Sequence, residues 1–423
     1  MSGTMMTRIA AVSAASALLY AMSANAADAE DYVLEAGQYG TITCSGDTSS
    51  DKGAGAARKY ATGGEVASFR YHDKAGIGYT AFLHKFTNTA EVAKFKNRFG
   101  KALPVRVLAV GGGGAGMDGF FYDYSNLLPG GGGGGGGGVS EIKKSLSVGE
   151  EWSIRVGAGG EIANHNYGAQ RGVAGGTSIS NALSEVVFVP GGGAGGGGRY
   201  EKETYSQPTV GAAGGGGSCD DSNQTDIING APGMYSSYTL NDAGGSEVPV
   251  GVPFKGGNGK ADGREAFGGG GGGAGASGEN QTGGLGLVSD ITGEDVVYGS
   301  GGGGGGNLRL IATKTNAYGE GGMGGTNAGC GGRVSWEVVN AGTVTNVYLT
   351  AATMPVANTG SGGGGGVSFA LAQTDEKVYI GDVLSPEWKS SQTCYATPGA
   401  DGVVIIRYEA VLDHPLGTVI VIR

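Results

Sequence analysis

The chain is poor in the residues that carry most enzyme chemistry. Its four histidines, His72, His84, His165 and His414, are scattered and form no His-Glu-x-x-His pattern. No Gly-x-Ser-x-Gly elbow is present, and residues 256–260 (GGNGK) lack the leading glycine and the following Ser or Thr of a P-loop. The acidic residues are dispersed and suggest no catalytic carboxylate pair. The sequence therefore argues against an enzyme and predicts no catalytic residue and no cofactor.

Metal-binding patterns are equally scarce. The four cysteines share no Cys-x-x-Cys spacing, which argues against zinc. Residues 113–120 (GGAGMDGF) fit one copy of a calcium-binding nonapeptide, but that motif binds calcium through stacked tandem copies and no second copy follows. Residues 220–226 (DDSNQTD) resemble an EF-hand loop without its glycine and terminal glutamate. We therefore predict no metal site.

Basic residues are outnumbered and unclustered. The chain has 28 Lys and Arg against 38 Asp and Glu, for a formal net charge of −10. Nucleic-acid phosphates require a concentrated basic surface. A nucleic acid is therefore excluded as a partner.

Long apolar runs are missing except at the N-terminus. Arg8 precedes an apolar stretch over residues 9–22, and Ala24-Asn25-Ala26 follows as an Ala-x-Ala cleavage site. About 14 apolar residues are too few to span a bilayer, so a signal peptide fits better than a membrane anchor. We expect residues 1–26 to be a signal peptide, no transmembrane segment after its cleavage, and export to the periplasm, the cell surface or the extracellular space.

The four cysteines suit an oxidising compartment, where an even number favours disulfides. Three pairings are open. One of them joins Cys44 to Cys394 across the ends of the domain and Cys219 to Cys330 within its glycine-rich interior.

Glycine is abundant instead, with 93 of 423 residues. Collagen requires glycine at every third position with much proline, whereas this chain has 11 prolines and solid glycine runs. Hydrophobic residues still make up 39%, which argues against disorder and allows one substantial core.

Apolar β-like segments lead directly into glycine along most of the chain. Examples are residues 105–110 (VRVLAV), 152–160 (WSIRVGAGG) and 186–190 (VVFVP), and the alternation in the first two is typical of half-buried strands. The longest pure glycine runs cover residues 130–138, 268–273, 301–306 and 362–366. We expect an N-terminal β segment over residues 27–64, with strands at 31–35 and 40–44, a glycine-rich β domain over 65–409 and a strand extension over 410–423. A helix is expected only over residues 90–98.

The glycine runs have two interpretations. Ordering a glycine residue costs about 1–2 kcal/mol of backbone entropy or more, which favours a flexible linker. Extended helices with three residues per turn offer an alternative, because bare segments can approach closely and hydrogen-bond laterally. Natural linkers mix glycine with serine, whereas these runs are interrupted chiefly by alanine, as at Ala194. We therefore favour packed glycine helices.

Four segments in this order resemble a known family: residues 78–87 (GYTAFLHKFT), 105–114, 152–160 and 402–408 (GVVIIRY). They are similar to the bacterial and phage glycine-rich domain of surface and tail-fibre proteins, and to the extracellular glycine-rich region of the anaplastic lymphoma kinase receptor. The resemblance implies a mainly β fold, a jelly-roll-like β-sandwich with an inserted polyglycine II helix bundle. Unlike tail fibres the chain has a secretory signal, and unlike the receptor it has no kinase segment.

The first functional hypothesis is an exported, non-catalytic structural protein of the cell surface or extracellular matrix. The second is an adhesin that binds a cell-surface protein or glycan through aromatic loops between the glycine runs. A third, ice binding, would require a Thr- or Ala-rich repeat that the sequence lacks. Exposed loop aromatics on a rigid scaffold are common binding anchors, although they also cover bundle ends or complete a core. The candidate recognition residues are Phe120, Phe121, Tyr122, Tyr124, Tyr200, Tyr205, Tyr235 and Tyr238.

Overall fold

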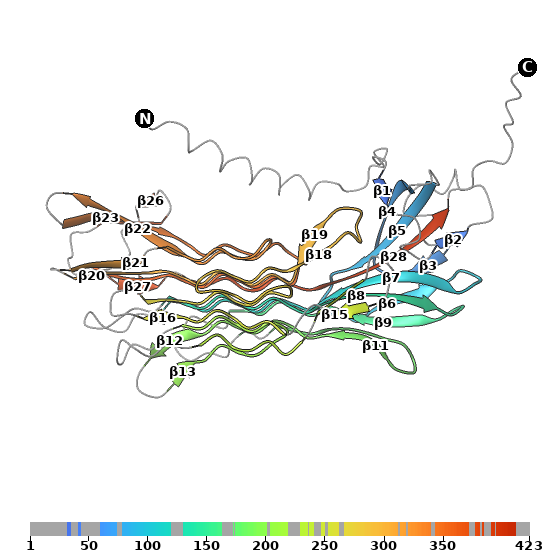
Figure 1. Ribbon diagram of the computed structural model, residues 1–423, viewed down its shortest axis with the longest axis horizontal. Helices are drawn as coiled ribbons and strands as arrows, with labels where there is room; N and C mark the ends of the chain where they lie inside the picture. Colours follow the sequence, from blue (N-terminus) through green and yellow to red (C-terminus); the bar gives the residue numbers. More distant parts are fainter. Residues whose placement is uncertain are drawn as a thin grey trace, which may run out of the picture.

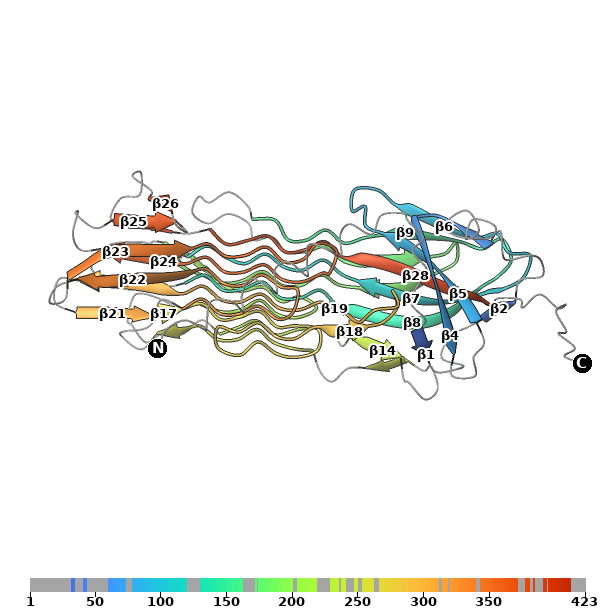
Figure 2. The same ribbon diagram turned by 90° about the horizontal axis from the view of Figure 1, so that it is seen from above.

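A computed structural model of the chain describes residues 32–34, 41–43, 60–73, 78–119, 130–162, 172, 174–200, 204–218, 229–235, 237–240, 247–249, 253–261, 266–311, 314–318, 320–339, 343–371, 377–380, 383–384, 391–393 and 395–411. These residues form an elongated molecule with three zones (Figures 1 and 2). A β-sandwich occupies one end, wavy glycine segments run side by side along the middle, and small sheets occupy the opposite, distal end.

Two sheets make up the β-sandwich. The five-stranded sheet has the order β11 (Glu185–Val189), β10 (Thr177–Ser180), β9 (Glu151–Arg155), β6 (Ala93–Asn97) and β3 (Ala61–Thr62). The nine-stranded sheet has the order β1 (Tyr32–Leu34), β4 (Glu65–Asp73), β5 (Gly78–Phe86), β28 (Val403–Val411), β7 (Leu103–Val110), β8 (Val139–Leu146), β14 (Tyr238–Leu240) and β15 (Glu247–Pro249), with β2 (Thr41–Thr43) also paired to β28.

Alternating side chains place the main core between these sheets. On β28, Val404, Ile406 and Tyr408 face the five-stranded sheet and pack with residues such as Phe95 and Trp152. The intervening residues of β28 point to the outer face of the nine-stranded sheet. A hairpin formed by β18 (Leu287–Ser289) and β19 (Val296–Tyr298) covers that outer face, where a second apolar cluster forms.

The distal end consists of four small sheets (Figures 1 and 2). Two are the hairpins of β12 (Gly197–Tyr200) with β13 (Thr204–Ser206) and of β16 (Lys260–Ala261) with β17 (Ala266–Phe267). The other two have the orders β21 (Lys314–Tyr318), β20 (Asn307–Ile311), β24 (Ser368–Leu371), β27 (Ser391–Thr393), and β22 (Arg333–Val339), β23 (Thr343–Thr350), β25 (Lys377–Ile380), β26 (Val383–Leu384).

The mainly β, sandwich-like fold predicted from the sequence is confirmed, and the named apolar segments form β7, β9, β11 and β28. The helix expected over residues 90–98 is wrong, because this segment contributes strand β6. Phe95 and Asn97 are buried there while Lys94 and Lys96 are exposed. This period of two matches an inner strand of a sheet packed on one face, which outweighs the local helix preference of Ala, Glu and Lys.

The glycine segments are joined by lateral backbone hydrogen bonds, and residues 130–138 lie at the centre. Successive N–H groups of this run donate to three different neighbours in rotation, so each neighbour meets every third residue. The donor–acceptor pairs are Gly131–Gly366, Gly132–Gly196, Gly133–Gly269, Gly134–Gly363, Gly135–Gly193, Gly136–Gly272 and Gly137–Gly360.

The carbonyl groups of the same run accept from three further segments. Gly114 donates to Gly135, Gly216 to Gly133, and Gly302 to Gly134, at 2.8–2.9 Å. Six segments thus surround the central run. Almost all of its buried N–H and C=O groups form hydrogen bonds with these segments.

Only glycine fits residues 130–137 of the central run, because adjacent backbones fill the space that each side chain would occupy. A Cβ atom on Gly133, Gly134 or Gly135 would lie 2.2, 2.0 or 2.3 Å from a carbonyl oxygen of three different segments. The interrupting alanines occupy outer segments, where Ala115 and Ala194 are still buried. The sequence-based interpretation of these runs as packed segments sharing lateral amide hydrogen bonds is confirmed.

Hydrogen exchange tests this packing directly. Amides of residues 131–138 are expected to exchange only through large-scale unfolding, because each is buried and hydrogen-bonded to another segment. Deuterium uptake by mass spectrometry should show strong protection for a fragment containing this run. A synthetic glycine peptide supplies the unprotected rate, and uptake at that rate in the intact protein would contradict the packing.

Candidate functional site

The sequence-predicted aromatic residues are spread over both ends of the rod. Phe120, Phe121, Tyr122 and Tyr124 lie outside the described residues. Tyr200 ends β12 and Tyr205 lies in β13, so both belong to a hairpin of the distal end (Figure 1).

Tyr235 and Tyr238 belong to the sandwich end. Tyr238 pairs with Ser140 of β8, which brings it into the nine-stranded sheet. Tyr235 is half-buried and packs against the main core, where its ring covers Gly138. Tyr235 therefore has the core-covering position that the sequence left open as an alternative to recognition.

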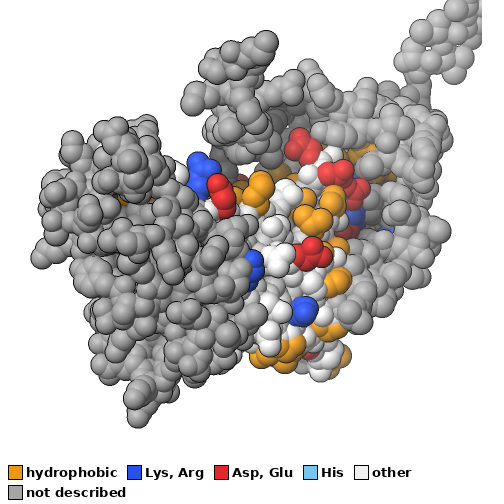
Figure 3. Space-filling view, turned by 60° about the vertical axis from the view of Figure 1, so that its left-hand side comes forward, with side chains coloured by type: hydrophobic (Ala, Val, Ile, Leu, Met, Phe, Trp, Pro, Cys, Tyr) orange, Lys and Arg blue, Asp and Glu red, His pale blue; other side chains and the backbone are white. Residues whose placement is uncertain are grey.

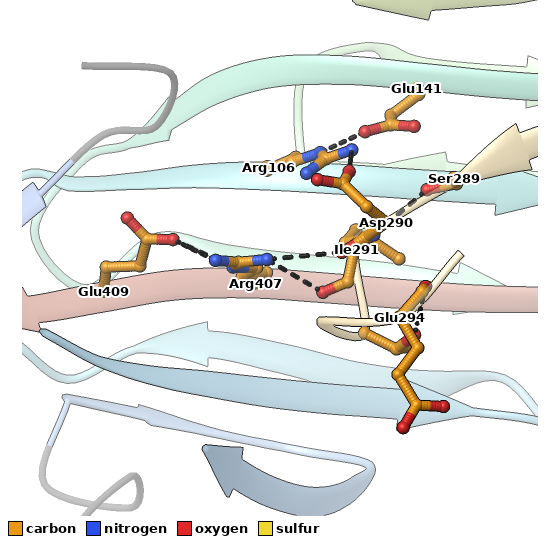
Figure 4. Close-up of polar contacts among 9 residues, drawn as sticks. Arg106, Glu141, Ser289, Asp290, Ile291, Glu294, Arg407 and Glu409 are labelled. Carbon is orange, nitrogen blue, oxygen red and sulfur yellow. Dashed lines mark hydrogen bonds and ion pairs between the residues drawn. The ribbon is translucent and has the colours of Figure 1, made fainter. Parts of the chain in front are cut away.

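A cluster of buried charges that sequence reasoning did not predict lies on the outer face of the nine-stranded sheet (Figure 4). Arg106 of β7 and Arg407 of β28 are cross-strand neighbours. Arg106 forms ion pairs with Glu141 of β8 and with Asp290. Arg407 pairs with Glu409, with its Nη2 2.6 Å from Oε1. The four sheet residues are at most 5% exposed.

The β18–β19 hairpin closes over this cluster through its turn. Besides the Asp290 carboxylate, the main-chain oxygens of Asp290 and Ile291 lie 3.4 Å from Nη1 of Arg407. Gly293 has φ +92° and lies on the Phe69 ring, which a Cβ atom would meet at 2.9 Å. In Figure 4, Asp290 points toward Arg106, whereas the carboxylate of Glu294 points away.

Aromatic rings complete the surroundings of Arg407. Its Cζ atom lies 4.9 Å from the centre of the Phe69 ring and 5.4 Å from that of Tyr71. The Tyr71 hydroxyl is hydrogen-bonded to Glu409. Such stacking suits the weakly hydrated, planar guanidinium and helps to offset its loss of water.

Burial governs the ionisation of this cluster. Desolvation raises the pKa of Glu409 despite the nearby Arg407, and it raises the pKa of Tyr71. Desolvation and Arg106 lower the pKa of Lys143. The ion pair from Asp290 to Arg106 and the contacts of Arg407 with the hairpin backbone join the hairpin to this buried cluster, so we interpret the cluster as an anchor of the hairpin on the sheet.

A sequence signal for this anchor does exist. Arg106 interrupts the apolar run VRVLAV, and Arg407 interrupts VVIIRYEA. A charged residue at an outward position of a half-buried strand ordinarily faces water. Only the hairpin over the outer face makes these positions buried.

His84 is a buried histidine within the main core. Its Nδ1 lies 2.6 Å from the carbonyl oxygen of Gly63, which can only accept, so Nδ1 carries the proton. Its Nε2, 3.1 Å from the Tyr408 hydroxyl, therefore accepts from that group. Both nitrogens are used, and burial lowers the pKa of His84 although the Gly63 bond opposes this. This geometry gives His84 a structural role in the core.

This neutral histidine predicts a loss of stability in weak acid. The unfolded state takes up a proton near pH 6.5, before the folded state does. The free energy of unfolding should therefore fall as the pH drops below about 6.5, with a slope of at most about 1.4 kcal/mol per pH unit from this group. Urea unfolding between pH 7.5 and 5 should show this component in the wild type and not in His84→Gln; equal pH dependence of both would contradict the assignment.

The structure also places Cys330 and Asp118, which belong to the disulfide and calcium patterns considered in the sequence. Cys330 is a free thiol, so the Cys219–Cys330 bond is not formed in this structure, while Cys44, Cys219 and Cys394 lie outside the described residues. The Asp118 carboxylate accepts the Ala396 N–H at 2.6 Å.

Within the described part of the chain, no group of three or more His, Cys, Asp or Glu is placed to hold a metal. The same part contains no helix long and apolar enough to cross a membrane.

Comparison with known proteins assigns the family. A search of curated proteins finds no match to the chain. A family model described as a glycine-rich domain matches residues 98–409, which include the central glycine run and both arginines of the anchor. Because this match covers most of the chain, the protein belongs to the glycine-rich domain family.

Proposed function

We propose that this protein is an exported, non-catalytic structural protein whose glycine rod is a bundle of polyglycine II helices. The observation that carries the proposal is the rotation of hydrogen bonds from the central run to a different neighbour at each residue. A three-residue repeat is the period of this helix, and none of residues 130–138 has a φ in the left-handed region. A rod that shares its amide hydrogen bonds in all lateral directions resists bending and local unfolding.

The buried charged groups among the described residues support a structural role over catalysis. Arg106, Glu141, Arg407 and Glu409 are packed beneath the β18–β19 hairpin, and both ring nitrogens of His84 are engaged within the core. Ion pairs and hydrogen bonds of this kind hold strands and the hairpin together, which favours a structural role for these side chains over contact with a substrate.

Location in the cell is the first test of this proposal. Fractionation of the producing cells, with mass spectrometry of the mature N-terminus, is expected to find the protein in the envelope or secreted fraction and cleaved after Ala26. Uncleaved protein confined to the cytosol would overturn the export part of the proposal.

Recognition at the distal end is a second candidate function. The β12–β13 hairpin carries Tyr200 and Tyr205 at the end of the rod farthest from the β-sandwich (Figure 1). A rigid rod whose distal hairpin contains two tyrosines in its sequence suits an adhesin for a surface protein or glycan. The likeness to tail fibres remains a sequence-based prediction that agrees with this arrangement.

Tyrosine variants distinguish the two functions. If the distal end recognises a partner, Tyr200→Ala with Tyr205→Ala should reduce attachment to host or neighbouring cells at least tenfold without lowering Tm. Tyr235→Ala should instead lower the free energy of unfolding by about 2–4 kcal/mol, because its ring packs against the core. Unchanged attachment for the distal variant would leave the structural function alone.

A further inference from the structure

Three turns lie side by side at the end of the β-sandwich that points away from the glycine segments. They join β10 to β11 (residues 181–184), β8 to β9 (147–150) and β6 to β7 (98–102), and we call them the outer turns. The sheet order β10–β9–β6 brings them together in that order. The opposite ends of β7, β9 and β11 lead toward glycine, so the outer turns form one end of the rod (Figures 1 and 2).

Side-chain hydrogen bonds fix the outer turns to one another. The Nδ2 group of Asn181 donates to Oε1 of Glu150 at 3.2 Å, which links the first turn to the second. The Nδ2 group of Asn97 donates to the carbonyl oxygens of Ser147 and Lys101, at 2.9 and 3.0 Å, which links the second turn to the third. The tips of the turns therefore keep fixed positions relative to one another.

Two of the outer turns carry exposed aliphatic side chains at their tips. Leu183 is 93% exposed and Val148 is 64% exposed. Neither side chain is needed to form its turn, because the Asn181 carboxamide oxygen accepts the Leu183 N–H in one and Gly149 provides a φ of +73° in the other. Single exposed apolar residues are ordinary, whereas two on adjoining turns without a local structural role indicate a contact outside the chain.

The outer turns and the strands of the five-stranded sheet that lead to them are basic, although the chain is acidic. Residues 93–102, 147–155 and 177–189 contain five Lys and Arg against three Glu, a formal charge of +2, whereas the whole chain has −10. Arg98 and Lys101 of the third turn are exposed, and neither forms an ion pair with a described residue.

The three glutamates do not cancel this charge at the tips. The Glu150 carboxylate is half-buried and occupied by hydrogen bonds within the turns. Glu151 pairs with both lysines of β6, with N···O distances of 3.3 and 3.8 Å. Glu185 is exposed at the start of β11, but so are the two cations of the third turn and Lys144, three residues before the second turn. The exposed charge around the tips is therefore positive.

Exposed apolar side chains also occur along the glycine rod and supply a comparison. Met323 and Met354 of its glycine segments are 71% and 63% exposed. On the face seen in Figure 3, hydrophobic side chains lie among both acidic and basic ones. The outer turns differ, because their apolar side chains project from an end of the rod where positive charge predominates.

We propose that the outer turns dock the rod end-on to the surface of an anionic lipid bilayer. Leu183 and Val148 would enter the boundary between headgroups and acyl chains, while the exposed basic residues contact lipid phosphates. A protein partner would need a pocket shaped for each projecting tip, whereas a deformable bilayer needs none. A second copy of this acidic chain offers no comparable anionic surface at its own outer turns. This attachment goes beyond the proposed structural function, and it would direct the distal end away from the membrane.

Vesicle cosedimentation tests the proposal. The purified chain without residues 1–26 is used, so that the apolar N-terminal stretch does not bind lipid itself. Vesicles that contain phosphatidylglycerol should bind it, and vesicles of phosphatidylcholine alone should bind it about tenfold more weakly or less. Leu183→Ser with Val148→Ser should weaken binding to the anionic vesicles by about tenfold or more. Arg98→Gln with Lys101→Gln should weaken it about tenfold and reduce its dependence on salt.

Matched controls separate docking by the outer turns from general adhesion to lipid. Met323→Ser with Met354→Ser removes exposed apolar side chains from the glycine rod and should leave binding unchanged. An equal loss in this control, equal binding to both kinds of vesicle, or no binding by the wild type would overturn the proposal.

Two further measurements complete the test. A dimer in analytical sedimentation that Leu183→Ser with Val148→Ser dissociates would also overturn the proposal, because the tips would then bind a second copy. All replaced residues are exposed, so the Tm of each variant should match that of the wild type. Vesicle binding by purified protein does not depend on where the cell places the chain, so this result is separate from the fractionation test of export.

Discussion

Replacing Gly134 by alanine is expected to prevent the protein from folding, or to cost more than about 4 kcal/mol of the free energy of unfolding. The new Cβ atom would lie 2.0 Å from the carbonyl oxygen of Gly114, an atom of fixed backbone. This steric clash can be relieved only if the central run moves away from Gly114. That movement stretches the bonds from Gly134 to Gly363 and from Gly302 to Gly134, now 2.9 and 2.8 Å long.

Two other glycines provide a graded comparison. Gly100 has no atom within 4 Å of an added Cβ and no positive φ, so Gly100→Ala should be neutral or stabilise by up to about 1 kcal/mol. Gly332 would place its Cβ 3.2 Å from the amide nitrogen of Val367, and Gly332→Ala should have an intermediate cost. Soluble yield and urea unfolding measure the series, and a Gly134→Ala protein as stable as Gly100→Ala would exclude a packed central run.

Replacing Arg407 by methionine should cost about 3–5 kcal/mol, because it leaves Glu409 buried without its charge partner. Glu409→Gln should also destabilise, since Arg407 then stays charged beneath the hairpin. The double variant Arg407→Met with Glu409→Gln is expected to be more stable than Arg407→Met alone. Burying a pair of charges costs free energy that a neutral pair does not require.

An exposed ion pair on the same sandwich is the control. Lys94 and Glu151 are 3.3 Å apart, with side chains 57% and 41% exposed, so Lys94→Met should change stability by less than about 1 kcal/mol. Urea unfolding of Arg407→Met, of Glu409→Gln and of the double variant gives the coupling energy between Arg407 and Glu409. Additive losses would show that Arg407 and Glu409 do not act as a pair.

Local patterns determined the strands that continue into glycine. Val105 and Val107 face the main core, and Arg106 between them faces outward, as their alternation predicts. The central run was equally predictable from its composition, because solid glycine excludes side-chain packing and leaves lateral amide bonds as the way to offset the entropy cost. Residues 90–98 were misjudged because helix propensity is a weak local preference, and the strand gains burial of Phe95 against the main core.

The sequence by itself determined a β-rich chain with packed glycine segments, because periodicity and the absence of side chains are local properties. Only the tertiary structure decided which segments surround residues 130–138, because identical glycines carry no information about their partners. It also decided that Arg106 and Arg407 are buried, since their burial depends on a hairpin more than a hundred residues away along the chain from either of them. The tertiary structure likewise decided that Tyr235 packs against the core, because this contact depends on where the β-sandwich meets the glycine rod at Gly138.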